Sequence, residues 1–391
     1  MRKNLVAITG LGMSPMARTD IGSTRDLAIA AAIACVEDAG IGLRDVQGLL
    51  MCRSPSKPTA ELPLKLRLDL GLEDLSLLAD LNMEGASSIG MIQTACLHIT
   101  SGLADLVLCV FGDTPLRSGV ESGAAAYNRV MNLTGIEGME ANSGLYGAAG
   151  PYALAAQRYL ARYALPADAL GCYAVASRRW AELNPDAFLR KPLDMEEYRR
   201  SRPIVDPFRV LDCAYPVNGA IAVLVCSPER ARDLRRPPVY IHACAQAHAA
   251  SRPFAGDESE LETGARIAAE SLWKQAQVTP DAVQMAQLYD AFSYIGLQAL
   301  EDYQLCPRGQ ATDFVASGVT SPGGSLPVAT GGGHLSGFYL QGMTPVAEAV
   351  LQARGQAGAR QNSRNELILV TGNGGRMDYH AAMLLSPKET L

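Results

Sequence analysis

Two stretches decide the fold of this 391-residue chain: Asn82-Met83-Glu84-Gly85-Ala86-Ser87-Ser88 and Gly331-Gly332-Gly333-His334-Leu335-Ser336-Gly337-Phe338-Tyr339. The first opens a pattern that predicts a helix running to Thr100. The second places His334 in a glycine-rich loop, where the small residues let the backbone approach a ligand closely. We therefore expect His334 to lie in a functional site.

Together these stretches resemble the two hallmark segments of the thiolase superfamily, in the branch related to sterol-carrier-protein-type thiolases. In that family the first segment carries a nucleophilic cysteine at the start of a buried helix. The second reads roughly Gly-His-Pro-x-Gly-Ala-Thr-Gly. Gly85 aligns with the nucleophile and Tyr339 with the threonine. The likeness covers nearly the whole chain and implies an α/β thiolase fold, whose duplicated βα halves stack as a five-layer αβαβα sandwich.

The catalytic cysteines of that family are absent here. Gly85 has no side chain that could form a covalent intermediate. Ser87 and Ser88 are nearby, but as small residues at a helix start they favour packing or capping over a nucleophilic role. The glycine-rich segment 368–375, where thiolases keep a second cysteine, contains none. The resemblance thus implies a retained fold without acyl-enzyme chemistry.

The order of predicted elements fits two related halves. We expect an N-terminal half over 1–230, with a long loop excursion at about 112–216 that is interrupted by helices, and a C-terminal half over 231–391. Strands are predicted at 5–9, 103–112, 218–225, 239–244, 284–288, 366–371 and 380–385, and helices at 26–38, 150–159, 168–183, 262–277, 293–303 and 340–354. The Gly-, Ala- and Ser-rich part at 112–151 suggests a functional excursion.

Composition excludes several classes of protein. The net charge of -6 gives no reason to expect a nucleic-acid partner. No apolar run approaches the ~20 residues of a membrane span, and the short apolar stretch after Met1 lacks the features of a secretion signal. Nine cysteines, an odd number, show no metal-ligand spacing and sit mostly in apolar runs, which favours reduced thiols in the cytoplasm and no metal site.

A second tyrosine stands in another family motif. Leu288-Tyr289-Asp290-Ala291-Phe292 occupies the place where thiolase relatives have segments such as His-Asp-x-Phe beside the active centre. The loss of cysteine at 85 together with tyrosines at 289 and 339 resembles the thiolase-like steroid side-chain aldolases. Those enzymes cleave a carbon–carbon bond of a β-hydroxyacyl-CoA, giving a ketone and a shorter acyl-CoA.

The chemistry of that cleavage suits these residues. A retro-aldol step needs a base for the β-hydroxyl proton, donors for the enolate oxygen and an acid for the α-carbon. Tyr289 and Tyr339 are the candidates for proton transfer, although an ordinary tyrosine pKa of ~10 requires help from neighbours. His334 and main-chain N–H groups of its loop are candidate oxyanion donors. Gly85 is expected to leave room for a bulky β-substituent.

Other interpretations of single residues stay open. A tyrosine after an apolar run is often a core ring with its hydroxyl bonded internally, and only their joint placement favours Tyr289 and Tyr339 as catalytic. Asp290 is expected either to orient a neighbour or to cap the following helix. Asn82 and Gly374 are supporting candidates by position. His98, His242, His248 and His380 are expected to be structural or surface residues.

No cofactor is predicted beyond the CoA of the substrate, whose contacts the sequence does not assign. The glycine-rich loops lack the endings of phosphate or dinucleotide motifs. The leading hypothesis is an aldolase on a 17-hydroxy steroid acyl-CoA that releases propionyl-CoA or acetyl-CoA. A cysteine-independent acyltransferase and a non-catalytic thiolase-like subunit remain alternatives. The resemblance also implies a homodimer and an OB-fold partner domain, fused to or associated with an enoyl-CoA hydratase.

Overall fold

The computed structural model describes residues 6–56, 62–117, 119, 127, 135–145, 147–248 and 261–391. The predicted first strand began at Leu5, which lies outside these ranges, as does most of the central part of the 112–151 excursion. Within the described ranges, no helix combines the length and the apolar character that crossing a membrane requires.

Nine strands form one mixed sheet in the order β3-β2-β4-β7-β1-β8-β11-β10-β9. The first five belong to the N-terminal half and the last four to the C-terminal half. The two halves join where β1 pairs antiparallel with β8, from Val6 opposite Ile241 to Ile8 opposite Val239. The strands are β1 (Val6–Met13), β2 (Gly48–Cys52), β3 (Leu77–Leu81), β4 (Leu106–Asp113), β7 (Gly219–Cys226), β8 (Val239–Ala247), β9 (Met285–Gln287), β10 (Ile368–Gly374) and β11 (Tyr379–Ser386).

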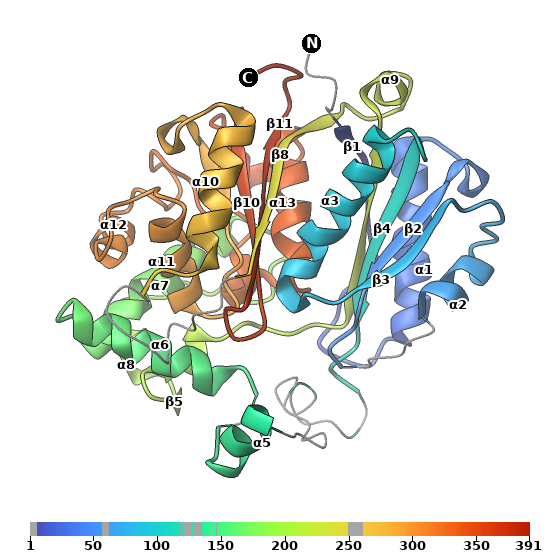
Figure 1. Cartoon of the computed structure of the whole chain (residues 1–391). Helices are drawn as coiled ribbons and strands as arrows, with labels where there is room; N and C mark the ends of the chain where they lie inside the picture. The colour runs from blue at the N-terminus through green and yellow to red at the C-terminus, as the bar shows by residue number, and fades with distance from the viewer. Residues whose placement is uncertain are drawn as a thin grey trace.

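The helices complete the layers of the predicted αβαβα sandwich. Helix α1 (Thr24–Ala39) covers the outer face of the first half, and α10 (Gly264–Ala276) covers that of the second, with α11 (Ser293–Asp302) packed against α10. Helices α3 (Ser87–Thr100) and α13 (Met343–Ala353) lie between the halves, as Figure 1 shows. Three groups of buried apolar side chains fill the spaces between these layers. The thiolase fold is therefore confirmed.

Most predicted elements lie where the apolar patterns placed them. The continuous apolar runs of β4 and β7 are buried along their whole length, as expected for strands covered on both faces. Helix α1 begins with a capping box at Ser23 and ends at Gly40, whose φ of 76° suits a glycine C-cap. The predicted boundaries of these elements differ from the observed ones by a few residues.

Short elements escaped the sequence analysis. Strands β2 and β3 and helix α2 (Leu62–Asp69) were not predicted, and the segment 184–216, expected to be a loop, contains three more elements. These are α8 (Met195–Arg200), β5 (Pro203–Val205) and β6 (Phe208–Arg209). Each is too brief to show a clear helical or strand period.

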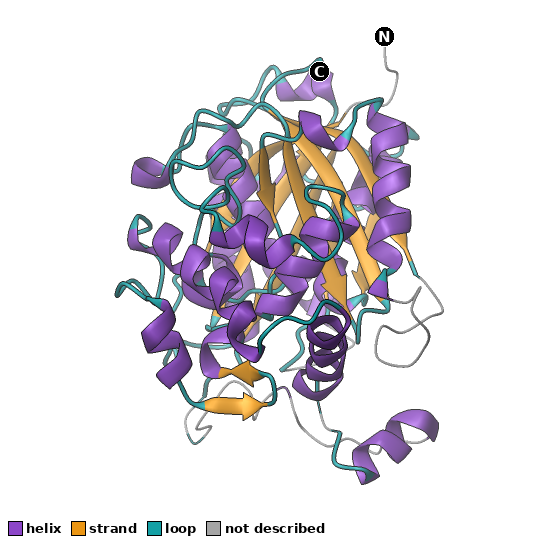
Figure 2. Cartoon of the chain, turned by 90° about the vertical axis from the view of Figure 1, so that its left-hand side faces the viewer, coloured by secondary structure: helices purple, strands orange, loops and turns teal. Residues whose placement is uncertain are grey.

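The 112–151 excursion ends in two helices at one end of the molecule. Helix α5 (Gly135–Asn142) projects from the body of the fold in Figures 1 and 2, and α6 (Ala149–Arg162) packs beneath the second half in Figure 1. Helix α7 (Gly171–Glu182) follows and contacts the loop that carries His334. This arrangement brings the excursion next to the glycine-rich loop.

Close packing of α1 on β1 makes a stability prediction. A Cβ atom at Gly12 would lie within 3.0 Å of backbone atoms of Ala31 and Cys35, which a rigid helix cannot move aside. We expect Gly12→Ala to lower the free energy of unfolding by about 3 kcal/mol, measured by urea denaturation. The control is Gly42→Ala, where the nearest atom is 3.6 Å away and φ is -94°. Equal stability of both variants would contradict this packing.

Candidate active site

Tyr289 is fixed at the junction between β9 and α11. Its backbone N–H donates to Thr371 Oγ1 on β10 at 2.9 Å, directly after the parallel pairing of β9 with β10 ends. The residue is 5% exposed. The bond from its backbone to Thr371 therefore fixes its position beside β10.

Tyr339 reaches the same point from the end of the glycine-rich loop. Its backbone N–H donates to the carbonyl of Tyr215 at 2.9 Å, which holds the segment extended against the chain before β7. The hydroxyls of Tyr289 and Tyr339 are 2.9 Å apart and form a hydrogen bond. The structure thus brings together the two tyrosines that the sequence singled out.

Gly85 lies directly beneath this pair. A Cβ atom at position 85 would come within 3.0 Å of two ring carbons of Tyr289 and of the carbonyl oxygen of Asn373. The expectation that Gly85 leaves room for a substrate substituent is therefore wrong, because the Tyr289 ring occupies that room. A cysteine at 85 and the observed ring position of Tyr289 exclude one another.

His334 supports the tyrosines instead of facing open space. Its Nε2 donates to the carbonyl of Gln341 at 2.7 Å, and its Nδ1 accepts from the backbone N–H of Asp290 at 3.1 Å. The ring is fully buried, and its centroid lies 4.8 Å from that of Tyr289 and 5.1 Å from that of Tyr339. The predicted oxyanion role of His334 does not fit this geometry, since both ring nitrogens already have partners.

The backbone N–H groups of this loop were also expected to be oxyanion donors, but those of His334, Ser336, Gly337 and Phe338 already donate hydrogen bonds within the protein. His334 donates its N–H to Asp290 Oδ1 at 2.8 Å, and Ser336, Gly337 and Phe338 donate theirs to carbonyls of Gly332 and Gly333. Asp290 therefore orients the His334 turn. It does not cap α11, whose N-cap is Phe292.

The remaining candidates have structural positions. Asn82 is exposed and has no side-chain partner among the described residues, so it does not join the tyrosine pair. Gly374 is buried on β10, where a Cβ atom would collide with the carbonyl of Met83, so a glycine is required for the strand to pass the Gly85 turn. Ser87 is buried and its hydroxyl accepts from the Met83 N–H at 2.7 Å, whereas α3 has no side-chain cap among the described residues, so Ser87 packs at the helix start and does not cap it.

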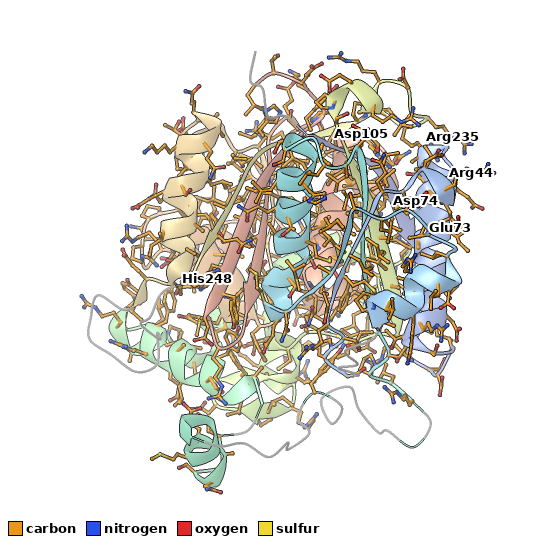
Figure 3. All side chains as sticks on the ribbon, turned by 45° about the vertical axis from the view of Figure 1, so that its right-hand side comes forward. Arg44, Glu73, Asp74, Asp105, Arg235 and His248 are labelled. Atoms are coloured by element: carbon orange, nitrogen blue, oxygen red, sulfur yellow. The ribbon has the colours of Figure 1, made fainter. Side chains whose placement is uncertain are left out.

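The other four histidines lie outside the tyrosine pair, as expected. His248 is exposed at the end of β8, labelled in Figure 3, and its ring packs on that of Tyr379 at 5.4 Å. His242 and His380 are buried, and each has a ring nitrogen within 3.0 Å of a backbone carbonyl. His98 lies 3.3 Å from the Ser76 hydroxyl. In the described ranges no cluster of His, Cys, Asp or Glu could hold a metal ion.

Several residues of the site were missed by sequence reasoning. Tyr152 on α6 is 3% exposed and donates to Asn373 Oδ1 at 2.8 Å, while the backbone carbonyl of Asn373 closes the space beside Gly85. Glu84 has a φ of 47°, unusual for a residue with a side chain, and accepts from the Gly375 N–H at 3.0 Å. No motif marked these positions, because each gains its place only through contacts between distant segments.

Burial governs the protonation of the tyrosines. It raises the pKa of Tyr289 well above the ordinary value, and the neighbouring Tyr339 hydroxyl raises it further. Burial likewise raises the pKa of Tyr339, with added repulsion from Glu84 and Asp113. Both hydroxyls are therefore protonated at neutral pH and present O–H groups that can donate and accept.

Comparison with known proteins agrees with the fold. Residues 245–387 match the family described as thiolase C-terminal domain-like. A crystal structure of human mitochondrial 3-ketoacyl-CoA thiolase is similar at a TM-score of 0.72, with 14% identity over 99% of both chains. A solved Ltp2–ChsH2(DUF35) aldolase is similar at a TM-score of 0.88, with 28% identity over 99% of both chains.

Two curated relatives are similar along nearly their full length. A steroid side-chain-cleaving aldolase of Thermomonospora curvata is 31% identical over 94% of this chain and 95% of its own. The 17-hydroxy-3-oxo-4-pregnene-20-carboxyl-CoA lyase of Mycobacterium tuberculosis is 31% identical over 96% and 98%. The fold and the altered site define a thiolase-like protein without the cysteine nucleophile. Within that class, the chain belongs to the family of steroid side-chain-cleaving aldolases.

The clash between a side chain at position 85 and the Tyr289 ring can be tested by adding one methyl group at Gly85. We expect Gly85→Ala to displace the Tyr289 ring and to lower turnover by about 100-fold or more, since small displacements of reacting groups are costly. Turnover is measured by steady-state kinetics, and the ring position by crystallography. The control is Gly90→Ala on α3, where the nearest atom is the flexible Met83 sulfur at 3.1 Å. Wild-type turnover of Gly85→Ala with an unmoved Tyr289 would refute the exclusion.

Proposed function

We propose that this chain is an aldolase that cleaves the side chain of a 17-hydroxy steroid acyl-CoA by a retro-aldol reaction. The products are a 17-ketosteroid and a short acyl-CoA, either propionyl-CoA or acetyl-CoA. The observation that carries the proposal is the hydrogen-bonded pair of Tyr289 and Tyr339, held where a thiolase would need its cysteine. Similarity to two enzymes with this type of activity supports it.

The reaction fits a site whose tyrosines are protonated. The bond between the α- and β-carbons breaks while the β-hydroxyl loses its proton and becomes a ketone. The electron pair passes to the thioester enolate, whose α-carbon then takes up a proton. Because one proton leaves and one is added, no net acid or base is consumed, and no covalent intermediate is formed.

A pair of phenols suits this exchange. One hydroxyl accepts the substrate proton as it passes its own proton to its partner, and the partner passes its own proton to the α-carbon of the enolate. Neither tyrosine must therefore exist as a free phenolate in the resting enzyme. The raised pKa values of both tyrosines are compatible with such concerted transfer. Either tyrosine can take either role. The His334 ring packs against both tyrosine rings, and Asp290 holds His334 in place by accepting its backbone N–H.

The activity test compares wild type with variants that lack only one tyrosine hydroxyl. Wild type incubated with a 17-hydroxy steroid acyl-CoA should release ketone and short acyl-CoA in equal amounts without added free CoA. Tyr289→Phe and Tyr339→Phe should each lose about 10²–10⁴-fold in turnover while staying folded, because only the proton-transfer group is removed. The control is Tyr303→Phe, another buried tyrosine, whose hydroxyl has no partner among the described residues. Near-normal turnover of both site variants would rule out the two-tyrosine mechanism.

The proposal includes an assembly. The name of the Ltp2–ChsH2(DUF35) aldolase includes a DUF35 component, which supports the proposed OB-fold partner. We further propose that this partner is fused to or associated with an enoyl-CoA hydratase. Within the described ranges one edge of the sheet is open, which supports a homodimer formed by strand pairing at that edge. The edge at β9 pairs with the segment around Val328, whereas β3 pairs only with β2 among the described residues. A cytoplasmic location fits the nine free thiols, of which six are buried.

The open edge of β3 gives the test of the dimer. Leu78 on β3 is 38% exposed, and a lysine there should block strand pairing between two copies. We expect wild type to sediment as a dimer and Leu78→Lys as a monomer, while Ile267→Lys on the outer face of α10 stays dimeric. Co-expression with the OB-fold partner should raise solubility and turnover. A fully active wild-type monomer that gains nothing from the partner would contradict the assembly.

A further inference from the structure

A buried carboxylate that the reaction scheme does not use is linked to Tyr339 through Tyr127. Asp113 ends β4 and is 1% exposed. Its Oδ1 accepts hydrogen bonds from the Ser54 and Ser56 hydroxyls and from the Thr114 N–H at 3.0 Å. Its Oδ2 accepts from the Tyr127 hydroxyl at 3.1 Å. The two oxygens therefore serve different parts of the chain.

Tyr127 connects this carboxylate to the tyrosine pair. Its ring stands edge-on to that of Tyr339, with centroids 6.1 Å apart and an interplanar angle of 75°. On another side, the His334 ring meets Tyr339 at 5.1 Å and 72°. Tyr339 thus contacts two rings edge-on, and each of these rings is fixed by hydrogen bonds of its own. The Tyr127 tether comes from the N-terminal half, and the His334 network comes from the C-terminal half.

Burial of the Asp113 carboxylate disfavours its charged form. Burial raises the pKa of Asp113, and hydrogen bonds from Ser54, Ser56 and Tyr127 act against that shift. A buried charge is weak evidence for stability, because an apolar group of similar size often does as well. An apolar residue at position 113 could not orient Tyr127, because the Tyr127 hydroxyl needs a hydrogen-bond acceptor there.

We infer that Asp113 is a positioning residue of the aldolase: it fixes Tyr127, whose ring holds the Tyr339 hydroxyl toward Tyr289. This inference rests on the proposed function for its kinetic readout, but its structural readout does not. Asp113 acts through Tyr127 and does not touch the reacting atoms in this account.

Two single substitutions and the double variant test the role of the hydrogen bond between Tyr127 and Asp113. In Asp113→Asn the amide oxygen is expected to stay with the four donors at Oδ1, which are the Ser54 and Ser56 hydroxyls and the Ser56 and Thr114 N–H groups. An NH₂ group then replaces the acceptor that faces Tyr127. Tyr127→Phe removes the hydroxyl and keeps the ring. Each variant should lower kcat by about 10-fold to 100-fold, with KM within about threefold of wild type, because geometry and not binding is lost. The double variant should be no slower than the slower single variant, since both break one link.

Ser56→Ala provides the matched control. It removes a donor to Oδ1 and leaves the Tyr127 contact intact, so it should lower the melting temperature without lowering kcat. Multiplicative losses in the double variant, or a loss in Ser56→Ala equal to that in Tyr127→Phe, would overturn the inference. So would wild-type kcat in Tyr127→Phe.

A crystal structure of Tyr127→Phe separates this inference from the proposed function. We expect the distance between the Tyr339 and Tyr289 hydroxyls to increase beyond hydrogen-bonding range from the present 2.9 Å. An unchanged pair would refute the inference whether or not wild type cleaves the steroid thioester. A wild type inactive on that substrate, with a displaced pair in the variant, would refute only the proposed substrate.

Discussion

The ring of Tyr289 occupies the volume that any side chain at position 85 would need. Most features of the site depend on this close approach. Gly374 is a glycine so that β10 can pass the turn that carries Gly85, and the Asn373 carbonyl closes the same space. Loss of the cysteine and gain of the tyrosine are thus one structural event. Restoring one without removing the other would strain three segments at once.

The surroundings of the pair explain how two hydroxyls stay aligned in a buried place. Tyr289 is fixed through its backbone to Thr371, and Tyr339 through its backbone to the segment before β7. His334 and Asp290 exchange two hydrogen bonds, and the His334 ring packs against both tyrosine rings. The glycine-rich loop therefore holds the two tyrosines next to the turn that carries Gly85.

Sequence reasoning was accurate where one segment carries the signal and failed where two must meet. The strands β4 and β7 follow from long apolar runs, and the tyrosine pair follows from two motif positions. The role of Gly85 was misjudged, because its neighbour Tyr289 is distant in the chain and no local pattern reports a clash. His334 was expected to face a ligand, but the partners of its two nitrogens lie in other segments. Tyr127 and Tyr152 gave no signal, since ordinary tyrosines acquire their roles by packing.

The central claim is that this site breaks a carbon–carbon bond by moving a proton through two phenols, without a covalent intermediate. Isotope uptake tests it most directly. Cleavage of the 17-hydroxy steroid acyl-CoA in D₂O, followed by mass spectrometry of the short acyl-CoA, should find one deuterium at the α-carbon. Product acyl-CoA incubated separately with enzyme and ketone corrects for later exchange. A covalently labelled enzyme, or acyl-CoA release that requires free CoA, would contradict the account.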